Sequence, residues 1–232
     1  MTLQEIQLKI YDKLKPSGWA DKLKTFILSA EFGVILQTLY NDVQAGRRFT
    51  PILKHLFRAF EECPYDKLKV VVVGQDPYPQ INVSDGIAFS CSEGKVPPSL
   101  RFIFGDIERT IYPEGRTLDP DLTRWANQGV LMLNTALTCE LNKIGSHVEL
   151  WKPFMRYLFD TLNSYNTGII YLFLGEKAKE WHTMINGKNN YKMFASHPAS
   201  AAYRKDKSWS SAGAFRQINV ILKKNNGDEI IW

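Results

Sequence analysis

The chain has 232 residues, of which 44% are hydrophobic and 12% aromatic, enough to bury a sizeable core, and its net charge is +5. Its three cysteines are far apart and odd in number, which argues against a disulfide framework and a four-cysteine metal site. No apolar run is long enough to span a bilayer, and the first residues lack the layout of a signal peptide, so we expect no membrane association. The positive charge is compatible with a nucleic-acid partner but is weak support alone.

The first sixty residues have helical patterns. Thr2 and Glu5 have the spacing of a capping box ahead of an amphipathic segment. Segment 49–63 is predicted to be another helix, with Thr50 as its N-cap and Pro51 in its first position, because its apolar residues recur at helical spacing. There is no repeat or flexible linker, so we expect one domain over residues 1–232, with an N-terminal helical part (1–49) and a core (50–232).

Beyond residue 60 the pattern changes to short apolar runs that alternate with helical segments. The runs are near-continuous, as is typical of strands covered on both faces of a sheet. Strands that alternate with helices pair in parallel through right-handed crossovers, so we expect an α/β fold. The expected strands are 69–73, 129–134, 168–175 and 192–197, and the expected helices are 97–111, 151–165, 176–185 and 210–224.

Three of these strands end in side chains with chemical capacity. The first leads into Gln75 and Asp76, and the second ends at Asn134. The last ends at Ser196 and His197. The carboxyl ends of parallel strands lie at one edge of a sheet, where ligands bind. We therefore expect an acid, an amide and an imidazole to face a single cleft.

Asp76 allows three interpretations: a turn cap, a metal ligand or a catalytic group. An aspartate before a proline commonly starts a turn. Asp85 and His197 are candidate partners for a metal, but no spacing resembles a metal motif. The segment GQDPYPQ lacks the glycine spacing of a phosphate loop and places a negative charge where phosphate would lie. A nucleotide site of the common types is therefore not expected.

Other residues also have both a structural and a chemical interpretation. The amide of Asn134 either satisfies loop backbone or reads an amide-like edge such as that of a pyrimidine. His197 is either a packed histidine or a hydrogen-bond donor to an oxygen that gains charge. Phe89 either packs in the core or stacks on a base. The cationic cluster 203–207 is either a solvated turn or part of a nucleic-acid surface.

Five motifs occur in a fixed order along the chain: GQDPYP (74–79), DGIAFS (85–90), PPSL (97–100), WANQGVLMLNTALT (125–138) and SHPASAA (196–202). In this order they resemble the uracil-DNA glycosylases of family 1, and the final EIIW is similar to the end of that family. The resemblance covers about residues 50–232, and the ordered set is far more specific than any single motif. It implies an α/β domain with a short, mostly parallel four-stranded central sheet flanked by helices.

The resemblance implies a monofunctional DNA glycosylase that hydrolyses the N-glycosidic bond of deoxyuridine and releases free uracil in base excision repair. The family uses neither metal nor cofactor, so none is expected here. The base is extruded from the stack before cleavage. Carried over to this sequence, Asp76 positions the water and stabilises the positive charge on the sugar. His197 hydrogen-bonds uracil O2 as the base leaves as an anion.

Four residues are implied to bind the uracil. Asn134 reads the O4 and N3 edge and rejects cytosine, and Phe89 stacks on the ring. Tyr78 blocks the space that a thymine methyl needs, and Gln75 lines the pocket near Asp76. The chemistry requires the acid to be held in place, which accounts for the stiff, proline-containing loop around it.

The implied DNA contacts depart from the family pattern. Glu176 stands where a serine is usual, and Ala201 stands where the family has a leucine that wedges into the duplex. Ala201 therefore predicts weaker holding of the flipped state in duplex DNA and a relative preference for single strands. Pro79 and Asp85 stand where the family usually has histidines, so we expect different surroundings for Asp76. The implied contact residues, with Ser200, Tyr203 and Arg204 as substitutes for missing contacts, are Pro98, Ser99, Gly175, Ser200, Ala201, Tyr203 and Arg204.

Two other functions stay open: a DNA-binding replication scaffold with weak or no activity, and a glycosylase for a modified pyrimidine. The intact set of Asp76, Asn134 and His197 favours an active enzyme over a scaffold, and Tyr78 argues against bulky 5-substituents. The expected partners are uracil-containing DNA, single- or double-stranded, and a small acidic inhibitor protein that mimics DNA. We expect a monomer in the cytoplasm of a bacterium or of a virus-infected host cell.

Overall fold

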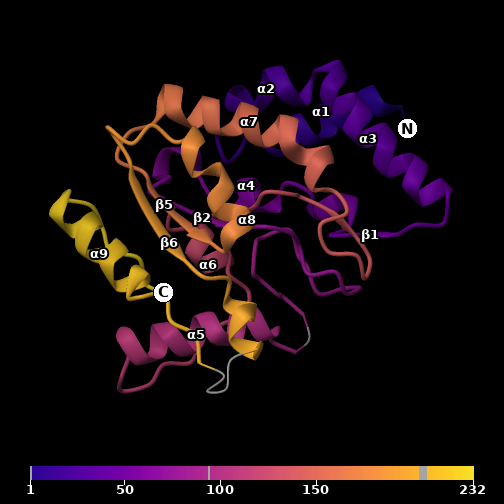
Figure 1. Ribbon diagram of the computed structural model, residues 1–232. Helices are drawn as coiled ribbons and strands as arrows, with labels where there is room; N and C mark the ends of the chain where they lie inside the picture. Colours follow the sequence, from indigo (N-terminus) through magenta and orange to yellow (C-terminus); the bar gives the residue numbers. More distant parts are fainter. Residues whose placement is uncertain (1, 94, 204–207) are drawn as a thin grey trace.

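The computed structural model describes residues 2–93, 95–203 and 208–232, and a four-stranded sheet lies at its centre (Figure 1). The strands lie in the order β3-β2-β5-β6, and each neighbouring pair is parallel. Their bounds are Val70–Gly74 (β2), Val130–Asn134 (β3), Ile170–Leu174 (β5) and Tyr191–Ala195 (β6). The α/β fold with a parallel four-stranded sheet is therefore confirmed.

The register of the sheet brings the ends of its central strands level. Gly74 at the end of β2 pairs with Asn134 at the end of β3. The valines of β2 are fully buried, which accounts for their unbroken apolar run. β6 differs, because it is an edge strand whose Tyr191 and Phe194 are 39% and 42% exposed. The expectation that every strand is covered on both faces is wrong for β6.

Helices cover the sheet on two sides (Figure 1). On one side lie α1 (Leu3–Lys13), α2 (Ala20–Ile27), α3 (Ala30–Gln44) and α7 (Val148–Tyr165), and on the other lie α5 (Pro98–Thr110) and α9 (Ala214–Lys224). The predicted capping box begins α1: Glu5 N donates to Thr2 Oγ1 at 3.2 Å, and Thr2 N donates to Glu5 Oε2 at 2.8 Å. The shorter helical segments are α4 (Arg58–Glu62), α6 (Thr123–Ala126), α8 (Glu176–Lys179), η1 (Leu53–His55), η2 (Tyr65–Lys67), η3 (Glu180–Met184) and η4 (Pro198–Tyr203).

The single helix predicted over 49–63 is wrong. Thr50 does not cap a helix, because it belongs to β1 (Phe49–Thr50), which pairs antiparallel with β4 (Cys139–Glu140). The Thr50–Pro51 peptide bond is cis, and the chain continues through η1 before α4 begins. Ile52 is 57% exposed, so the apolar spacing did not mark one continuous buried face.

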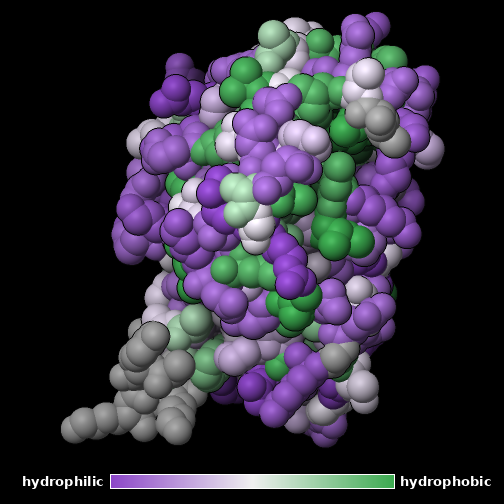
Figure 2. Space-filling model, turned by 90° about the vertical axis from the view of Figure 1, so that its right-hand side faces the viewer, coloured by the Kyte–Doolittle hydropathy of each residue, from purple (hydrophilic) through white to green (hydrophobic). Residues whose placement is uncertain are grey.

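The surface on the side of α3 and β1 is mostly hydrophilic, and its hydrophobic side chains form separate groups (Figure 2). Among the described residues, no helix combines the length and the apolar character needed to cross a membrane. Near β1, the loop that leads into α7 lies beside the loop that follows β2 (Figure 1), and Asn142 N donates to Pro79 O at 2.9 Å. These two loops border the site described next.

Candidate active site

The carboxyl ends of β2, β3 and β6 lead into one cavity of about 290 Å³. Every residue predicted from the sequence to act in catalysis or uracil binding lines it: Gln75, Asp76, Tyr78, Phe89, Asn134 and His197. Parallel pairing brings them together, as expected from the polar ends of the strands. The roles assigned to them are a separate question, which depends on the local geometry.

Asp76 is held through one of its two carboxylate oxygens. Oδ2 accepts hydrogen bonds from Gln75 Nε2 at 2.7 Å and from Gly145 N at 3.1 Å. Oδ1 is buried and accepts no hydrogen bond from any described residue. Burial raises the pKa of Asp76 above its usual range, while the two donors on Oδ2 act in the opposite direction. The carboxylate therefore has one fixed oxygen and one available for chemistry.

Gly74 provides the space in which Asn134 and Phe89 meet. A Cβ at residue 74 would lie 2.6 Å from Asn134 Oδ1 and 3.0 Å from two ring atoms of Phe89. The side-chain amide of Asn134 makes no hydrogen bond to another described residue, so its donors and its acceptor remain available in the cavity. A glycine after four valines is thus required by the close approach of an amide and an aromatic ring.

The backbone around His197 fixes the tautomer of its ring. Ala199 N donates to His197 Nδ1 at 3.1 Å, so Nδ1 is an acceptor and the proton of the neutral ring is on Nε2. Burial lowers the pKa of His197, which favours this neutral form. Gly175 lies against the imidazole: its φ is +97°, and a Cβ there would be 2.9 Å from His197 Cβ. Larger residues at 175 would displace the imidazole.

Phe89 has an unusual backbone conformation that surrounding bonds maintain. Its φ is +64°, in the left-handed region that non-glycine residues rarely adopt, and it is almost fully buried. The Tyr78 hydroxyl donates to Phe89 O at 2.9 Å, and Ala88 N donates to Met132 O at 3.1 Å. The ring of Phe89 lies 5.9 Å from that of His197 between centroids. Tyr78 thus fixes the segment that presents the aromatic face.

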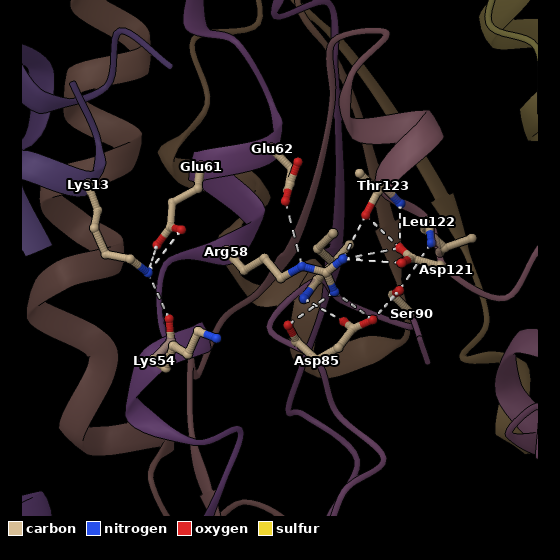
Figure 3. A network of polar contacts seen from close by, with 11 residues as sticks. Lys13, Lys54, Arg58, Glu61, Glu62, Asp85, Ser90, Asp121, Leu122 and Thr123 are labelled. Atoms are coloured by element: carbon tan, nitrogen blue, oxygen red, sulfur yellow. Dashed lines mark hydrogen bonds and ion pairs between the residues drawn. The ribbon is translucent and has the colours of Figure 1, made fainter. Parts of the chain in front are cut away.

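Asp85 belongs to a network of polar contacts that includes Arg58 and Ser90 (Figure 3). Arg58 Nη1 lies 2.8 Å from Asp85 Oδ2, and the Ser90 hydroxyl donates to the same oxygen at 2.7 Å. Arg58 Nη2 also reaches Asp121 at 3.2 Å. Asp85 is buried and absent from the lining of the cavity, whereas Pro79 does line it. Asp85 accepts hydrogen bonds from Ile87 N and the Ser90 hydroxyl, and it thereby holds the Phe89 segment. That Pro79 and Asp85 give Asp76 different surroundings stays a prediction.

The acidic and imidazole side chains do not form a metal site within the described part of the chain, where no group of three or more His, Cys, Asp or Glu side chains is arranged to hold an ion. Asp85 is engaged by Arg58 and Ser90 and does not meet His197 in the cavity. The metal interpretation of Asp76 therefore has no geometric support.

Two of the predicted DNA-contact segments lie at the cavity. Ser99 lines it and Pro98 is exposed at the start of α5, whose N-terminus has no side-chain cap. The N–H groups at such a helix end suit an anion. Gly175 precedes α8, and the exposed carboxylate of Glu176 lies 3.8 Å from Lys179 one turn further on. A surface pair of this kind partly neutralises the unfavourable charge predicted for Glu176.

In the third predicted segment, η4, Ala201 and the hydroxyl of Ser200 are turned inward. Ala201 is fully buried, and the Ser200 hydroxyl is buried with no partner among the described residues. Because η4 packs against α5, neither side chain lies at the surface for the DNA contact predicted for it. Tyr203 ends η4, but its side chain lies outside the described part, as does Arg204 entirely.

Sequence reasoning missed contributions that residue type does not reveal. Gly145 acts through its backbone N–H on Asp76, and Gly74 acts by lacking a side chain. Ile144 lines the cavity from the same loop as Gly145, but it belongs to no motif and has no polar group. The one signal in the sequence that could have indicated these contributions was the two glycines, because Gly74 precedes Gln75 and Gly145 follows Ile144, and both neighbours line the cavity.

Comparisons with known proteins agree with one another. The model of the uracil DNA glycosylase superfamily matches residues 60–223. The uracil-DNA glycosylase of Acinetobacter baumannii strain SDF is 33% identical over 100% of this chain and 98% of that protein, and that of Francisella philomiragia is 32% identical over 93% and 99%. The crystal structure of mimivirus uracil-DNA glycosylase has a TM-score of 0.83 at 27% identity, covering 94% of this chain and 86% of that chain. A mimivirus UNG variant in complex with UGI has a TM-score of 0.82 at 26% identity, covering 92% and 87%.

Proposed function

Because the chain belongs to the uracil DNA glycosylase superfamily and is a hydrolase that releases uracil from DNA for base excision repair, we propose that Asp76 and His197 are its catalytic residues. The observation that carries this proposal is their complementary arrangement in one cavity. Asp76 presents a free carboxylate oxygen, and His197 presents an Nε2–H donor on a neutral ring.

This arrangement fits the charges that develop as the N-glycosidic bond breaks. The sugar becomes cationic and the departing base becomes anionic. The carboxylate of Asp76 stabilises the cation, and its Oδ1 accepts a hydrogen bond from the water that attacks the sugar. His197 donates from Nε2 to uracil O2 without first taking up a proton, because Ala199 N–H occupies the other ring nitrogen. The buried setting strengthens both interactions.

Recognition of the base falls to three side chains around the cavity. The Asn134 amide pairs with uracil O4 and N3–H, and the exchanged donor and acceptor of cytosine leave this amide unpaired. Phe89 stacks on the ring in the orientation that Tyr78 fixes. The Tyr78 ring, held by its own hydroxyl bond to Phe89 O, occupies the space of a 5-methyl group and excludes thymine.

DNA phosphates are bound at the rim of the cavity. The uncapped start of α5, with Pro98 and Ser99, provides one anion site, and Gly175, which lies against His197, provides a second backbone contact. A small acidic protein that mimics DNA would use the same rim, and the similarity to a UNG variant in complex with UGI supports this partner. The bacterial and viral origins of the relatives support the cytoplasm of such cells as the setting.

The assigned roles are tested by single-turnover uracil release in EDTA. Asp76→Asn and His197→Ala should each lower the rate by at least about a hundredfold, because each removes a group that acts mainly on the transition state. Binding of uracil-containing DNA should be retained, and the control Lys15→Ala, which removes an exposed ion pair with Asp12 outside the cavity, should leave the rate unchanged. Unchanged rates in either catalytic variant would contradict its role.

A further inference from the structure

An isoleucine at the rim of the uracil cavity is unusually exposed. Ile144 lines this cavity and is 71% exposed, the largest value among the large hydrophobic side chains of the described residues. Single exposed apolar residues are common on protein surfaces and usually need no explanation. Ile144 differs because it lies where DNA must approach for a uracil to enter.

The loop that carries Ile144 is held in a fixed conformation. Asn142 and Gly145 on either side have φ values of +62° and +81°. The Ser146 hydroxyl accepts a hydrogen bond from Glu140 N at 2.8 Å, and Asn142 N donates to Pro79 O at 2.9 Å. These hydrogen bonds hold the loop in a conformation that leaves the Ile144 side chain in solvent. Without them the loop would be free to turn this side chain inward.

The position of Ile144 is also coupled to the catalytic acid. The next residue, Gly145, donates its N–H to Asp76 Oδ2 at 3.1 Å. The bond that fixes Asp76 therefore fixes the backbone beside Ile144. On the other side of Ile144, the Lys143 side chain is 67% exposed and brings a cation next to the apolar group. Lys143 Nζ also forms an ion pair with Glu140 Oε2 at 3.3 Å. An apolar side chain beside a cation suits the alternation of bases and phosphates in DNA.

We propose that Ile144 packs against the bases that flank the extruded uracil and thereby offsets part of the cost of unstacking it. This inference rests on the proposed function. It assigns to Ile144 a role in determining the rate of uracil release from duplex DNA relative to the rate from single strands. Extrusion costs a few kcal/mol in a duplex and least in a single strand, so an apolar contact at the mouth matters most on duplex DNA. The buried Ala201 cannot provide such a contact in this conformation.

The test compares uracil release from matched single-stranded and duplex oligonucleotides. In Ile144→Ala, kcat/KM on the duplex should fall about tenfold relative to that on the single strand, as expected when most of an isoleucine loses its apolar contacts. Ile144→Leu should keep the duplex-to-single-strand ratio within about threefold of the parent, because it conserves apolar volume. The matched control is Ile231→Ala, since Ile231 is 54% exposed and lies outside the cavity lining. It should leave both rates unchanged.

A second readout does not depend on catalysis. In an Asp76→Asn background, 2-aminopurine placed beside the uracil in a duplex should report unstacking when the protein binds, and Ile144→Ala should reduce this fluorescence change. If the parent releases uracil, but Ile144→Ala changes neither the duplex-to-single-strand ratio of kcat/KM nor the fluorescence signal, the role of Ile144 is overturned and the proposed function still stands. If the parent releases no uracil from either substrate, the proposed function fails and this inference fails with it.

Discussion

Gly74→Ala is the smallest substitution that tests how the base-recognition site is built. It adds one methyl group at the end of β2, at the point where Gly74 pairs with Asn134. The new Cβ would lie 2.6 Å from Asn134 Oδ1 and 3.0 Å from two atoms of the Phe89 ring. Since Gly74 is buried, the methyl group has no route to solvent, and its neighbours must move.

The size of the effect follows from these distances. Carbon atoms pack best at about 3.5–4.0 Å, so the Phe89 ring must retreat by roughly 0.5 Å or more and the amide of Asn134 by a similar distance. A shift approaching 1 Å in substrate-positioning groups costs about a hundredfold in rate. Overpacking of a buried site also lowers the free energy of unfolding by about 1–3 kcal/mol. We expect kcat/KM for uracil release to fall by about this hundredfold while the protein remains folded.

The assay is uracil release from a single-stranded oligonucleotide, combined with thermal unfolding. Gly33→Ala is the matched control, because a Cβ at this position in α3 meets nothing within 4 Å. Alanine is the better helix former, so the control should keep full activity and gain stability of up to about 1 kcal/mol. Wild-type activity in Gly74→Ala would refute the claim that Asn134 and Phe89 form one tightly packed recognition site.

Three other outcomes are expected. Asp85→Ala should lower the free energy of unfolding by about 3 kcal/mol, because it leaves the half-buried Arg58 with one partner fewer; a loss below about 1 kcal/mol in urea unfolding, as for an exposed pair, would contradict this. Single-turnover rates should rise with pH as Asp76 ionises, at a pH above that of an ordinary aspartate, since burial raises its pKa. Burial lowers the pKa of His197, and loss of a proton from that ring with rising pH acts in the same direction as ionisation of Asp76. A rate that is maximal below the usual aspartate pKa would therefore refute the assignment. Ala201 still predicts a preference for single strands, and equal rates on matched single- and double-stranded substrates would exclude it.

The sheet and the polar side chains at its edge were predictable because residue type and periodicity encode them. Four apolar runs alternate with helical segments, and this pattern favours parallel pairing. Parallel pairing then places Asp76, Asn134 and His197 at one edge, without any knowledge of their contacts. Their common cavity therefore follows from chain order.

Other features were beyond the sequence because long-range contacts decide them. Segment 49–63 has helical periodicity, but pairing of Thr50 with Cys139 of β4 overrides it. The Ser200 hydroxyl is buried because η4 packs against α5. Ile144 is exposed and also lines the cavity, and only the conformation of the folded loop places it there.

The most direct test of the account is the release of free uracil in EDTA. Oligonucleotides that carry a single uracil, cytosine or thymine at the same position would be incubated with the protein, and free base and alkali-labile sites would be measured. We predict free uracil and an equal number of alkali-labile sites from the uracil substrate, with neither product from cytosine or thymine. Tight binding of the uracil substrate without base release, or equal release of thymine, would contradict the account.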